Sequence, residues 1–347
     1  MKKRISVLVA AVIAIGCLAT ACGGNTGSEV TVGLGLHTQM DYSSKSATAD
    51  ANGLAQADLT VAAVTLNADG TIASIKVDAI QVKTDFDATG AITADTPTSF
   101  QTKRELGDKY SMKETSASIG TIEGGAEWYE QANAFEAWAK GKTVDQISAV
   151  ITEDGKANDE TLYAGCTMKI NGFVAATVKA CNEAKEGTYK ASSSDTLNIG
   201  IVAEVSSPTN ATAEANGSAT SYANFTAVTS DASGKITCCV LDSVQAKITW
   251  DTTGTITSDL TVDTTTKYDL KEGYGMKETS ANIGVIPEGG EWYEQADAFM
   301  AHVKGMTVSD VTSIAVGDDG KPTDEVLKAG CTMTVTAYIA AVEKALK

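Results

Sequence analysis

The feature that most constrains the fold of this chain is a long internal repeat. The block Met112–Ala117 returns unchanged as Met276–Ala281, 164 residues later. The block Glu127–Ala132 returns as Glu291–Ala296 with the same offset. This offset is far longer than the period of a stacked short repeat, so it indicates a duplicated domain. A chain of 347 residues has room for two domains of ordinary size.

Each copy is expected to fold as strands first and helices last. Residues 59–66 and 71–77 flank a turn at Gly70, which predicts a β-hairpin. Helices are predicted from Glu127 onward and from Thr167 to Ala184, where apolar residues recur at helical spacing. The fold class is therefore α+β, with two tandem copies of the same domain, each an antiparallel sheet followed by helices. The expected segments are a first copy over 31–184, a linker over 185–195 and a second copy over 196–347.

The N-terminus has the pattern of a lipoprotein signal peptide. Residues 1–21 begin with a basic cluster and continue with an apolar run that is too short to span a bilayer. Small residues then precede Cys22, which resembles a bacterial lipobox, in which the cysteine becomes the lipidated first residue. Cys17 is a weaker second candidate for this role. Residues 22–30 are predicted to form a polar tether, so we expect a protein held on the outer face of a membrane.

Charge and cysteine content limit the partners of the chain. The formal net charge is −17, and it becomes −20 once the three basic residues of the signal peptide are removed. So acidic a surface repels nucleic acid. Beyond the signal peptide and the lipobox, the cysteines match between the copies only at Cys166 and Cys331, and the chain has 2 histidines. The sequence therefore predicts neither a disulfide framework nor a metal site built on cysteine and histidine.

The same short motif precedes the last predicted helix of each copy. Residues 164–168 read Ala-Gly-Cys-Thr-Met and recur at 329–333. A helix entrance offers free backbone N–H groups and the positive end of the helix dipole, and both suit a phosphate. A glycine two residues before the threonine lets the backbone approach a bulky group. The motif points either to phosphate-linked cofactors on Thr167 and Thr332 or to threonines that simply cap their helices.

This motif resembles the signature of flavoproteins that carry FMN through a phosphoester bond to a threonine. In that family, Ser/Thr-Gly-Ala-Thr/Ser precedes a helix. Here the glycine and the threonine match, whereas Ala164 stands in place of the first Ser or Thr and Cys166 in place of Ala. With its lipobox, its tether and its two acidic copies, the chain is similar to the PplA-type surface lipoproteins of Gram-positive extracellular electron transfer.

The resemblance implies an electron carrier more than a turnover enzyme. It implies two covalent FMN groups per chain, attached to Thr167 and Thr332 by an ApbE-type FMN transferase after export. Electrons would pass from a membrane quinone-linked donor to an extracellular acceptor such as ferric iron or soluble flavin. The residues expected near the cofactors are Gly165, Cys166, Trp128 and Met112 in the first copy, and Gly330, Cys331, Trp292 and Met276 in the second.

Several of these residues have a plainer interpretation. Trp128 and Trp292 could stack on an isoalloxazine ring, but each shares a helix face with a phenylalanine, which is typical of a buried core. The block that starts at Met112 could line a cofactor pocket or could be a loop that both copies inherited. The alternative functions are a surface lipoprotein whose duplicated module binds a small ligand or a wall polymer, and a structural spacer.

Overall fold

The computed structural model describes residues 27–93 and 99–347 of the chain. The predicted signal peptide over 1–21, the lipidated Cys22 and most of the tether therefore lie outside the described residues. In the described part of the chain, no helix has both the length and the apolar character needed to cross a membrane.

The first half is an antiparallel sheet followed by a layer of helices, as predicted. Its long strands are β1 (Glu29–Gln39), β2 (Gly53–Leu66) and β3 (Ile72–Phe86). Together with the short β4 (Lys190–Ser192) they form a sheet of order β3-β2-β1-β4. The predicted hairpin joins β2 to β3, and Gly70 at its turn has a φ of 79°, which favours glycine. The helical elements are α1 (Lys103–Leu106), η1 (Gly107–Tyr110), α2 (Lys113–Ile119), α3 (Trp128–Ala139), α4 (Val144–Ser148), α5 (Glu160–Tyr163) and α6 (Asn171–Lys185).

The second half repeats this order. Its strands are β5 (Thr196–Thr209), β6 (Gly217–Ser230) and β7 (Ile236–Trp250), in a sheet of order β5-β6-β7. Its helical elements are α7 (Lys267–Leu270), η2 (Lys271–Tyr274), α8 (Lys277–Ile283), α9 (Trp292–Val303), α10 (Val308–Thr312), α11 (Glu325–Lys328) and α12 (Thr336–Leu346). The protein is thus an α+β fold built from two similar halves in tandem.

The predicted linker over 185–195 is partly built into the first sheet. Within it, β4 (Lys190–Ser192) pairs antiparallel with the start of β1, where Glu29 lies opposite Ser192. The N–H of Val32 also donates to the carbonyl of Tyr189 at 2.9 Å. Backbone hydrogen bonds therefore hold this connection, although its small and polar residues suggest a free segment.

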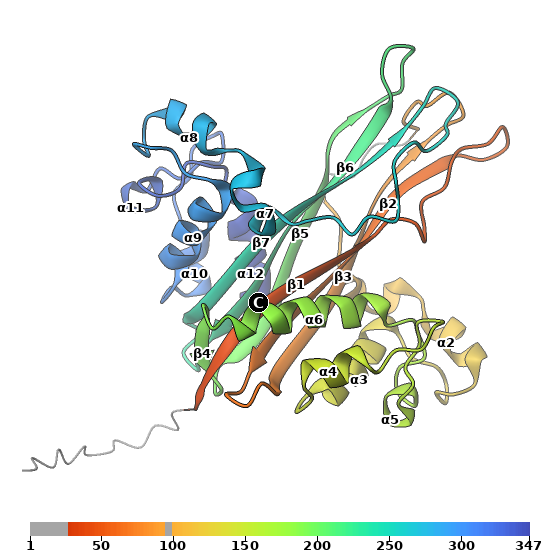
Figure 1. The fold of residues 1–347 in the computed structure, drawn as a ribbon, viewed down its shortest axis with the longest axis horizontal. Helices are drawn as coiled ribbons and strands as arrows, with labels where there is room; N and C mark the ends of the chain where they lie inside the picture. Colours follow the sequence, from red (N-terminus) through yellow and green to blue (C-terminus); the bar gives the residue numbers. More distant parts are fainter. Residues whose placement is uncertain (1–26, 94–98) are drawn as a thin grey trace, which may run out of the picture.

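The two sheets pack face to face, and helices cover the outer face of each (Figure 1). Helix α6 lies on β1 and β2, and α12 lies on β5 and β6. Strand β2 shows how the sequence builds these layers. Its Leu59, Val61 and Ala63 point into the core between the sheets, whereas Ala62 and Val64 point into the helical layer. Because side chains alternate along a strand, a strand that is buried on both faces has a continuous apolar run.

The contacts between the sheets are reciprocal. Phe86 and Trp250, at equivalent positions of the two halves, stack with ring centroids 4.3 Å apart and planes 4° apart. Two matched backbone bonds run from the N–H of Ala47 to the Gly254 carbonyl at 2.8 Å and from the N–H of Ala211 to the Gly90 carbonyl at 2.9 Å. Such an exchange of roles is typical of an interface between two copies related by a two-fold axis. The repeat divides near 185–195, but the core does not, because buried side chains from both sheets fill it together.

Candidate functional site

Thr167 lies in a loop between α5 and α6, so the prediction of a helix that starts there is wrong by four residues. Helix α6 begins at Asn171, and the residue at its cap position is Ile170. The N–H groups of the loop have partners outside the helix. The N–H of Thr167 donates to Oε1 of Gln131 at 2.9 Å, and that of Ile170 donates to the Gly155 carbonyl at 2.7 Å. Thr167 therefore neither caps the helix nor stands among free N–H groups at its entrance.

The hydroxyl of Thr167 points into the protein. The residue is 1% exposed, and its hydroxyl lies 3.4 Å from Oε1 of Gln131. The N–H of Met168 also donates to this oxygen, at 3.2 Å. An amide oxygen has two lone pairs, so three donors compete for it, and the hydroxyl is the most distant of them. The hydroxyl is therefore buried but weakly held.

Thr332 repeats this arrangement in the second half. It is 4% exposed and lies between α11 and α12, which begins only at Thr336. Its N–H and its hydroxyl lie 2.8 Å and 3.2 Å from Oε1 of Gln295. The two loops are thus built in the same way.

The amide nitrogen of each glutamine side chain reaches the repeated block Met112–Ala117 in the first half or Met276–Ala281 in the second. Nε2 of Gln131 donates to the Ser116 hydroxyl at 3.3 Å and to the Ala126 carbonyl at 3.1 Å. Gln295 makes matching bonds to Ser280 at 3.2 Å and to a backbone carbonyl at 2.9 Å. We call these two sets the threonine networks: Ser116, Gln131 and Thr167 in the first half, and Ser280, Gln295 and Thr332 in the second. All six residues are buried.

Sequence reasoning missed the glutamine of each network, whereas Ser116 and Ser280 were already candidates as members of the repeated block that starts at Met112 and Met276. Gln131 follows Trp128 by one turn on the buried face of α3, where a polar residue is unusual. A glutamine at a core position inside a repeated block was therefore the available signal. Without the fold, however, nothing in the sequence connects it to a threonine 36 residues away.

The glycines of the motif allow each loop to pack closely on a helix. A Cβ on Gly165 would lie 2.9 Å from the Cβ of Ala134, and one on Gly330 would lie 2.8 Å from that of Ala298. Both separations are shorter than a van der Waals contact. The loops thus pack directly on α3 and α9 at these glycines.

The cysteines of the motif are core residues. Burial raises the pKa of Cys166 and of Cys331 to about 12, so both thiols are neutral and poorly nucleophilic. Cys238 and Cys239 follow each other on β7, so they point to opposite faces and fill two different cores. Among residues 27–93 and 99–347, no group of His, Cys, Asp and Glu is arranged to hold a metal ion.

The methionines and the tryptophans belong mainly to the scaffold. The N–H of Met112 donates to the carboxylate of Glu127 at 2.8 Å, and that of Met276 donates to Glu291 at 2.8 Å. The block after Met112 forms helix α2 instead of a loop that lines a pocket. Trp128 and its counterpart Trp292 are buried in the helical layers. The ring of Trp128 nevertheless also forms part of the wall of a cleft.

This first-half cleft has a volume of about 460 Å³ and lies between the sheet and the helical layer. Asp58 of β2 and Gln81 of β3 line it from the sheet. The lining residues from the helical layer are Lys103, Tyr110 and Trp128 of α1, η1 and α3, and Lys169, Asn171 and Phe173 at the start of α6, and the loops contribute Tyr42, Glu153 and Asp154. Lys169 follows Thr167 by two residues, so the cleft adjoins the loop of the first threonine network.

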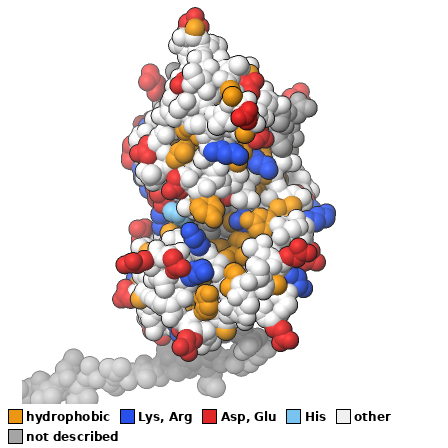
Figure 2. Space-filling view, turned by 90° about the vertical axis from the view of Figure 1, so that its right-hand side faces the viewer, with side chains coloured by type: hydrophobic (Ala, Val, Ile, Leu, Met, Phe, Trp, Pro, Cys, Tyr) orange, Lys and Arg blue, Asp and Glu red, His pale blue; other side chains and the backbone are white. Residues whose placement is uncertain are grey.

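Cations and aromatic rings alternate along the cleft. Nζ of Lys103 lies 4.7 Å from the ring centroid of Tyr110 and 5.6 Å from that of Trp128. Phe173 meets Trp128 edge to face at 5.4 Å. The acidic charge of the protein is not uniform, since basic and hydrophobic side chains gather near the centre of the face shown in Figure 2. The rings of the cleft suit a planar aromatic ligand, and its two lysines suit an anionic group placed beside them, away from the carboxylates of Asp58, Glu153 and Asp154.

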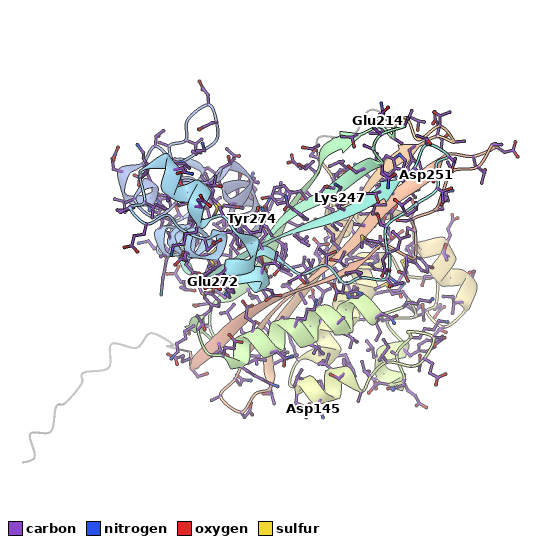
Figure 3. The ribbon with its side chains drawn as sticks, turned by 45° about the horizontal axis from the view of Figure 1, so that its top comes forward. Asp145, Glu214, Lys247, Asp251, Glu272 and Tyr274 are labelled. Atoms are coloured by element: carbon purple, nitrogen blue, oxygen red, sulfur yellow. The ribbon has the colours of Figure 1, made fainter. Side chains whose placement is uncertain are left out.

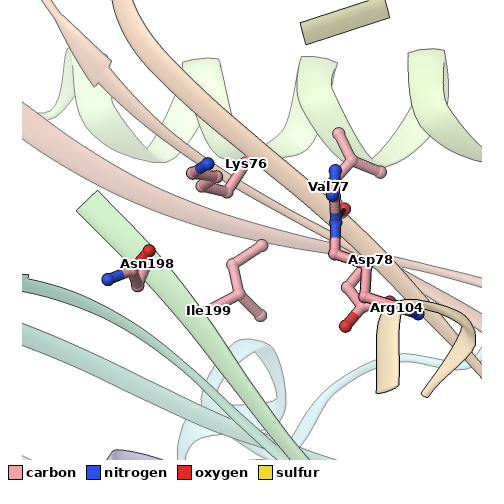
Figure 4. A pocket seen from close by; sticks show the side chains of 6 residues that line it. All are labelled: Lys76, Val77, Asp78, Arg104, Asn198 and Ile199. Atoms are coloured by element: carbon pink, nitrogen blue, oxygen red, sulfur yellow. Dashed lines mark hydrogen bonds between the residues drawn. The ribbon is translucent and has the colours of Figure 1, made fainter. Parts of the chain in front are cut away.

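A smaller pocket of about 110 Å³ lies between β3 and β5 (Figure 4). The guanidinium of Arg104 bonds to Glu136 at 2.5 Å and to the Val77 carbonyl at 2.7 Å. Burial raises the pKa of Asp78 to about 6, against the opposing effects of a hydrogen bond from Thr102 and the charge of Arg104. Because these groups satisfy one another, the pocket is best described as an ion-pair cluster at the junction of the halves.

Comparison with known proteins gives one local similarity. No protein-family description and no solved structure matches the chain. Over 87 residues, the chain is 32% identical to a chlorophenol reductase of Desulfitobacterium hafniense. The matched stretch is 25% of this chain and 25% of that protein, so it spans about a quarter of each. This similarity is too partial to place the chain in a family.

Proposed function

We propose that the protein is an electron carrier on the outer face of the cell membrane, with FMN esterified to Thr167 and Thr332. A lipid on Cys22 would anchor it. Electrons would pass from a membrane quinone-linked donor to ferric iron or soluble flavin. The observation that carries the proposal is the pair of threonine networks, in which three repeated sequence blocks converge on one threonine in each half.

The distances within the networks favour modification at the hydroxyl. In the first network the glutamine oxygen lies 2.9 Å from the N–H of Thr167 and 3.4 Å from its hydroxyl. In the second, the corresponding distances for Thr332 are 2.8 Å and 3.2 Å. An ester at the hydroxyl therefore replaces the longer contact and leaves the backbone bond able to re-form. Both hydroxyls are buried, so the loop must be displaced while the transferase acts.

The attachment itself is a group transfer. The threonine oxygen forms a bond to the phosphorus of FMN as the phosphoanhydride of a flavin dinucleotide breaks, and the nucleoside monophosphate leaves. The hydroxyl proton passes to a base of the transferase. A threonine hydroxyl is a weak nucleophile unless a base activates it, and the adjacent Cys166 is a neutral, buried thiol. The need for an outside base fits a separate ApbE-type FMN transferase.

When bound, FMN supplies reversible uptake and release of electrons. The chain's contribution is retention and placement. A flavin that dissociates outside the cell is lost, so a covalent bond would keep the cofactor on the chain where reversible binding would release it. The partial similarity to a chlorophenol reductase agrees with a redox role, but a shared quarter of each chain does not transfer its substrate.

The second candidate is a surface lipoprotein that binds a small ligand without a covalent bond. The first-half cleft favours this function, because its volume of about 460 Å³ falls in the usual range of ligand sites. Ligand binding of this kind would require neither threonine hydroxyl.

The mass of the purified protein distinguishes the two functions. Produced together with an FMN transferase, the wild type should gain two FMN units, and Thr167→Val and Thr332→Val should each gain one. The double variant should gain none. Valine keeps the shape of threonine and the shorter backbone N–H bond to the glutamine, and it removes only the longer hydroxyl contact, so the variants are expected to fold.

Thr161→Val, on the exposed side of α5, is the matched control and should keep both flavins. A wild type that stays unmodified in a strain proven to flavinylate another protein would contradict the proposal. Flavin found on Thr115 or Thr279 would move the attachment site to the α2 and α8 blocks.

A further inference from the structure

We infer that the two halves are unequal: the first holds an open cleft for a planar aromatic anion of the flavin class, and the second has closed the equivalent cleft with its own side chains. The inference rests on the proposed function for the identity of the ligand. It does not require the ligand to be covalently attached.

The lining residues of the two clefts correspond through the repeat. Three of them are retained, since Lys103, Tyr110 and Trp128 correspond to Lys267, Tyr274 and Trp292. Three others have changed, since Asp58, Lys169 and Phe173 correspond to Tyr222, Thr334 and Tyr338. The second half has therefore gained one ring and two phenolic hydroxyls at this place, and it has lost one cation and one carboxylate.

In the second half, these side chains pack against one another. Lys267 is 5% exposed, and its Nζ donates to the Tyr222 hydroxyl at 3.1 Å. The same Nζ lies 4.5 Å, 4.7 Å and 5.8 Å from the ring centroids of Tyr222, Tyr274 and Trp292. Tyr274 stands where the helical layer meets the sheet (Figure 3). The lysine is thus enclosed by three rings and occupies the space that a ligand would need.

Tyr338 closes the remaining side. Nε1 of Trp292 donates to the Tyr338 hydroxyl at 3.0 Å, and the two rings meet nearly at right angles. Tyr338 is buried. In the first half the corresponding residue is Phe173, which has no hydroxyl and leaves Nε1 of Trp128 without this partner. Opening the second-half cleft would therefore break hydrogen bonds that the first half never makes.

The first half keeps the same place open. Where Tyr222 projects its ring, Asp58 turns its short side chain to Gln81 and Ser43, which donate to it at 2.6 Å and 3.1 Å. Lys103 is half-buried and faces the cleft over two rings. Lys169 adds a second cation beside the loop of Thr167. The cleft is lined by these two lysines and by three carboxylates, those of Asp58, Glu153 and Asp154. A ligand must therefore place a compact anionic group beside the lysines and make its other contacts through an aromatic body.

Titration with free FMN tests the inference on the full chain, produced without a transferase and therefore unmodified. We expect one FMN per chain, with quenching of flavin fluorescence by the rings of the first-half cleft. Asp58→Tyr, which copies the second half into the first, should abolish saturable binding. Lys169→Thr changes only a residue at the cleft surface and should weaken binding by roughly three- to tenfold.

The reverse exchange provides the matched variant. Tyr222→Asp combined with Tyr338→Phe copies the first half into the second and should raise the stoichiometry from one FMN to two. Two equal sites in the wild type, one site that survives Asp58→Tyr, or no FMN binding at all would each overturn the inference.

The failures of the two proposals are separable. If the unmodified chain binds one FMN but gains no covalent flavin from an active transferase, the open cleft is supported and the proposal of a covalent electron carrier is contradicted. If both threonines carry flavin and the two flavins have the same fluorescence yield, the covalent carrier is supported and the inference that the halves are unequal is contradicted.

Discussion

The two halves agree closely at the threonine networks and diverge at the clefts. The hydrogen bonds that both networks share differ by about 0.2 Å at most, as between 3.4 Å for the Thr167 hydroxyl and 3.2 Å for that of Thr332. At the clefts, by contrast, Asp58, which lines the open cleft, corresponds to Tyr222, which is bonded to a buried lysine.

The contrast follows from what each substitution costs. In a buried network every polar atom depends on its neighbours, and losing one member leaves the others unpaired at about 1–3 kcal/mol each. A residue that lines an open cleft has water as an alternative partner, so it can change without such a penalty. Residues that are identical in the two copies therefore mark the scaffold around each threonine. Residues that differ between the copies mark the places where the two halves bind different groups.

Separating the halves is expected to have the largest effect. Residues 27–184 and 196–347, each produced alone, would expose the sheet faces around Phe86 and Trp250 that form the shared core. We expect neither to be a folded monomer, in contrast to the independence that the repeat alone suggests. Loss of cooperative unfolding by circular dichroism, together with the mass from light scattering, measures this.

Co-expression of the two halves is the control for that experiment. The reciprocal contacts should allow the halves to associate into a folded complex with the unfolding midpoint close to that of the full chain. A single half that is monomeric and unfolds sharply would show that the core between the sheets is dispensable.

Breaking one network should have the next largest effect, and it should be alike in both halves. Gln131→Leu leaves the N–H groups of Thr167 and Met168 without their acceptor, so we expect a loss of about 3–5 kcal/mol in the free energy of unfolding. Gln295→Leu should cost a similar amount. The exposed Gln101→Leu is the control and should change stability by less than about 0.5 kcal/mol. A large difference between the two buried variants, measured by urea unfolding, would show that the networks are not equivalent.

The sequence predicts those parts of the fold that depend on neighbouring residues. The hairpin around Gly70, helix α3 and the α+β order of each half all follow from local periodicity and turn chemistry, and the structure confirms them. The start of α6 does not follow in this way. Apolar residues of helical period extend back towards Thr167, but the side chain of Gln131 captures the N–H groups there and delays the helix to Asn171.

The shared core and the cleft cannot be predicted from neighbouring residues, because they are built from segments that are far apart in the sequence. The continuous apolar run from Val61 to Leu66 shows that β2 is buried on both faces, but not that the second sheet covers one of them. Similarly, Lys103 and Lys267 look identical in the repeat. Only the fold shows that Tyr222 of β6 encloses Lys267, whereas Asp58 at the equivalent position of β2 leaves Lys103 accessible.

The smallest expected effect is a pH dependence that belongs to the closed cleft alone. Burial lowers the pKa of Lys267 to about 8, although the charge of Asp242 opposes this shift. As pH rises above 8, the folded protein releases this proton while the unfolded chain holds it until about 10.5. The buried cysteines, whose pKa values burial raises from 9.0 to about 11 or 12, lower the free energy of unfolding over this interval in the wild type and in each variant alike. Against that common background, the proton that Lys267 keeps in the unfolded state should raise the free energy of unfolding by about 1–2 kcal/mol between pH 8 and 9.5. Lys267→Met should remove this rise, whereas Lys247→Met, which removes an exposed lysine of β7, should keep it.

Parallel stability profiles for the wild type and Lys267→Met over this interval would mean that Lys267 is hydrated, and the second-half cleft would then have to be open in solution.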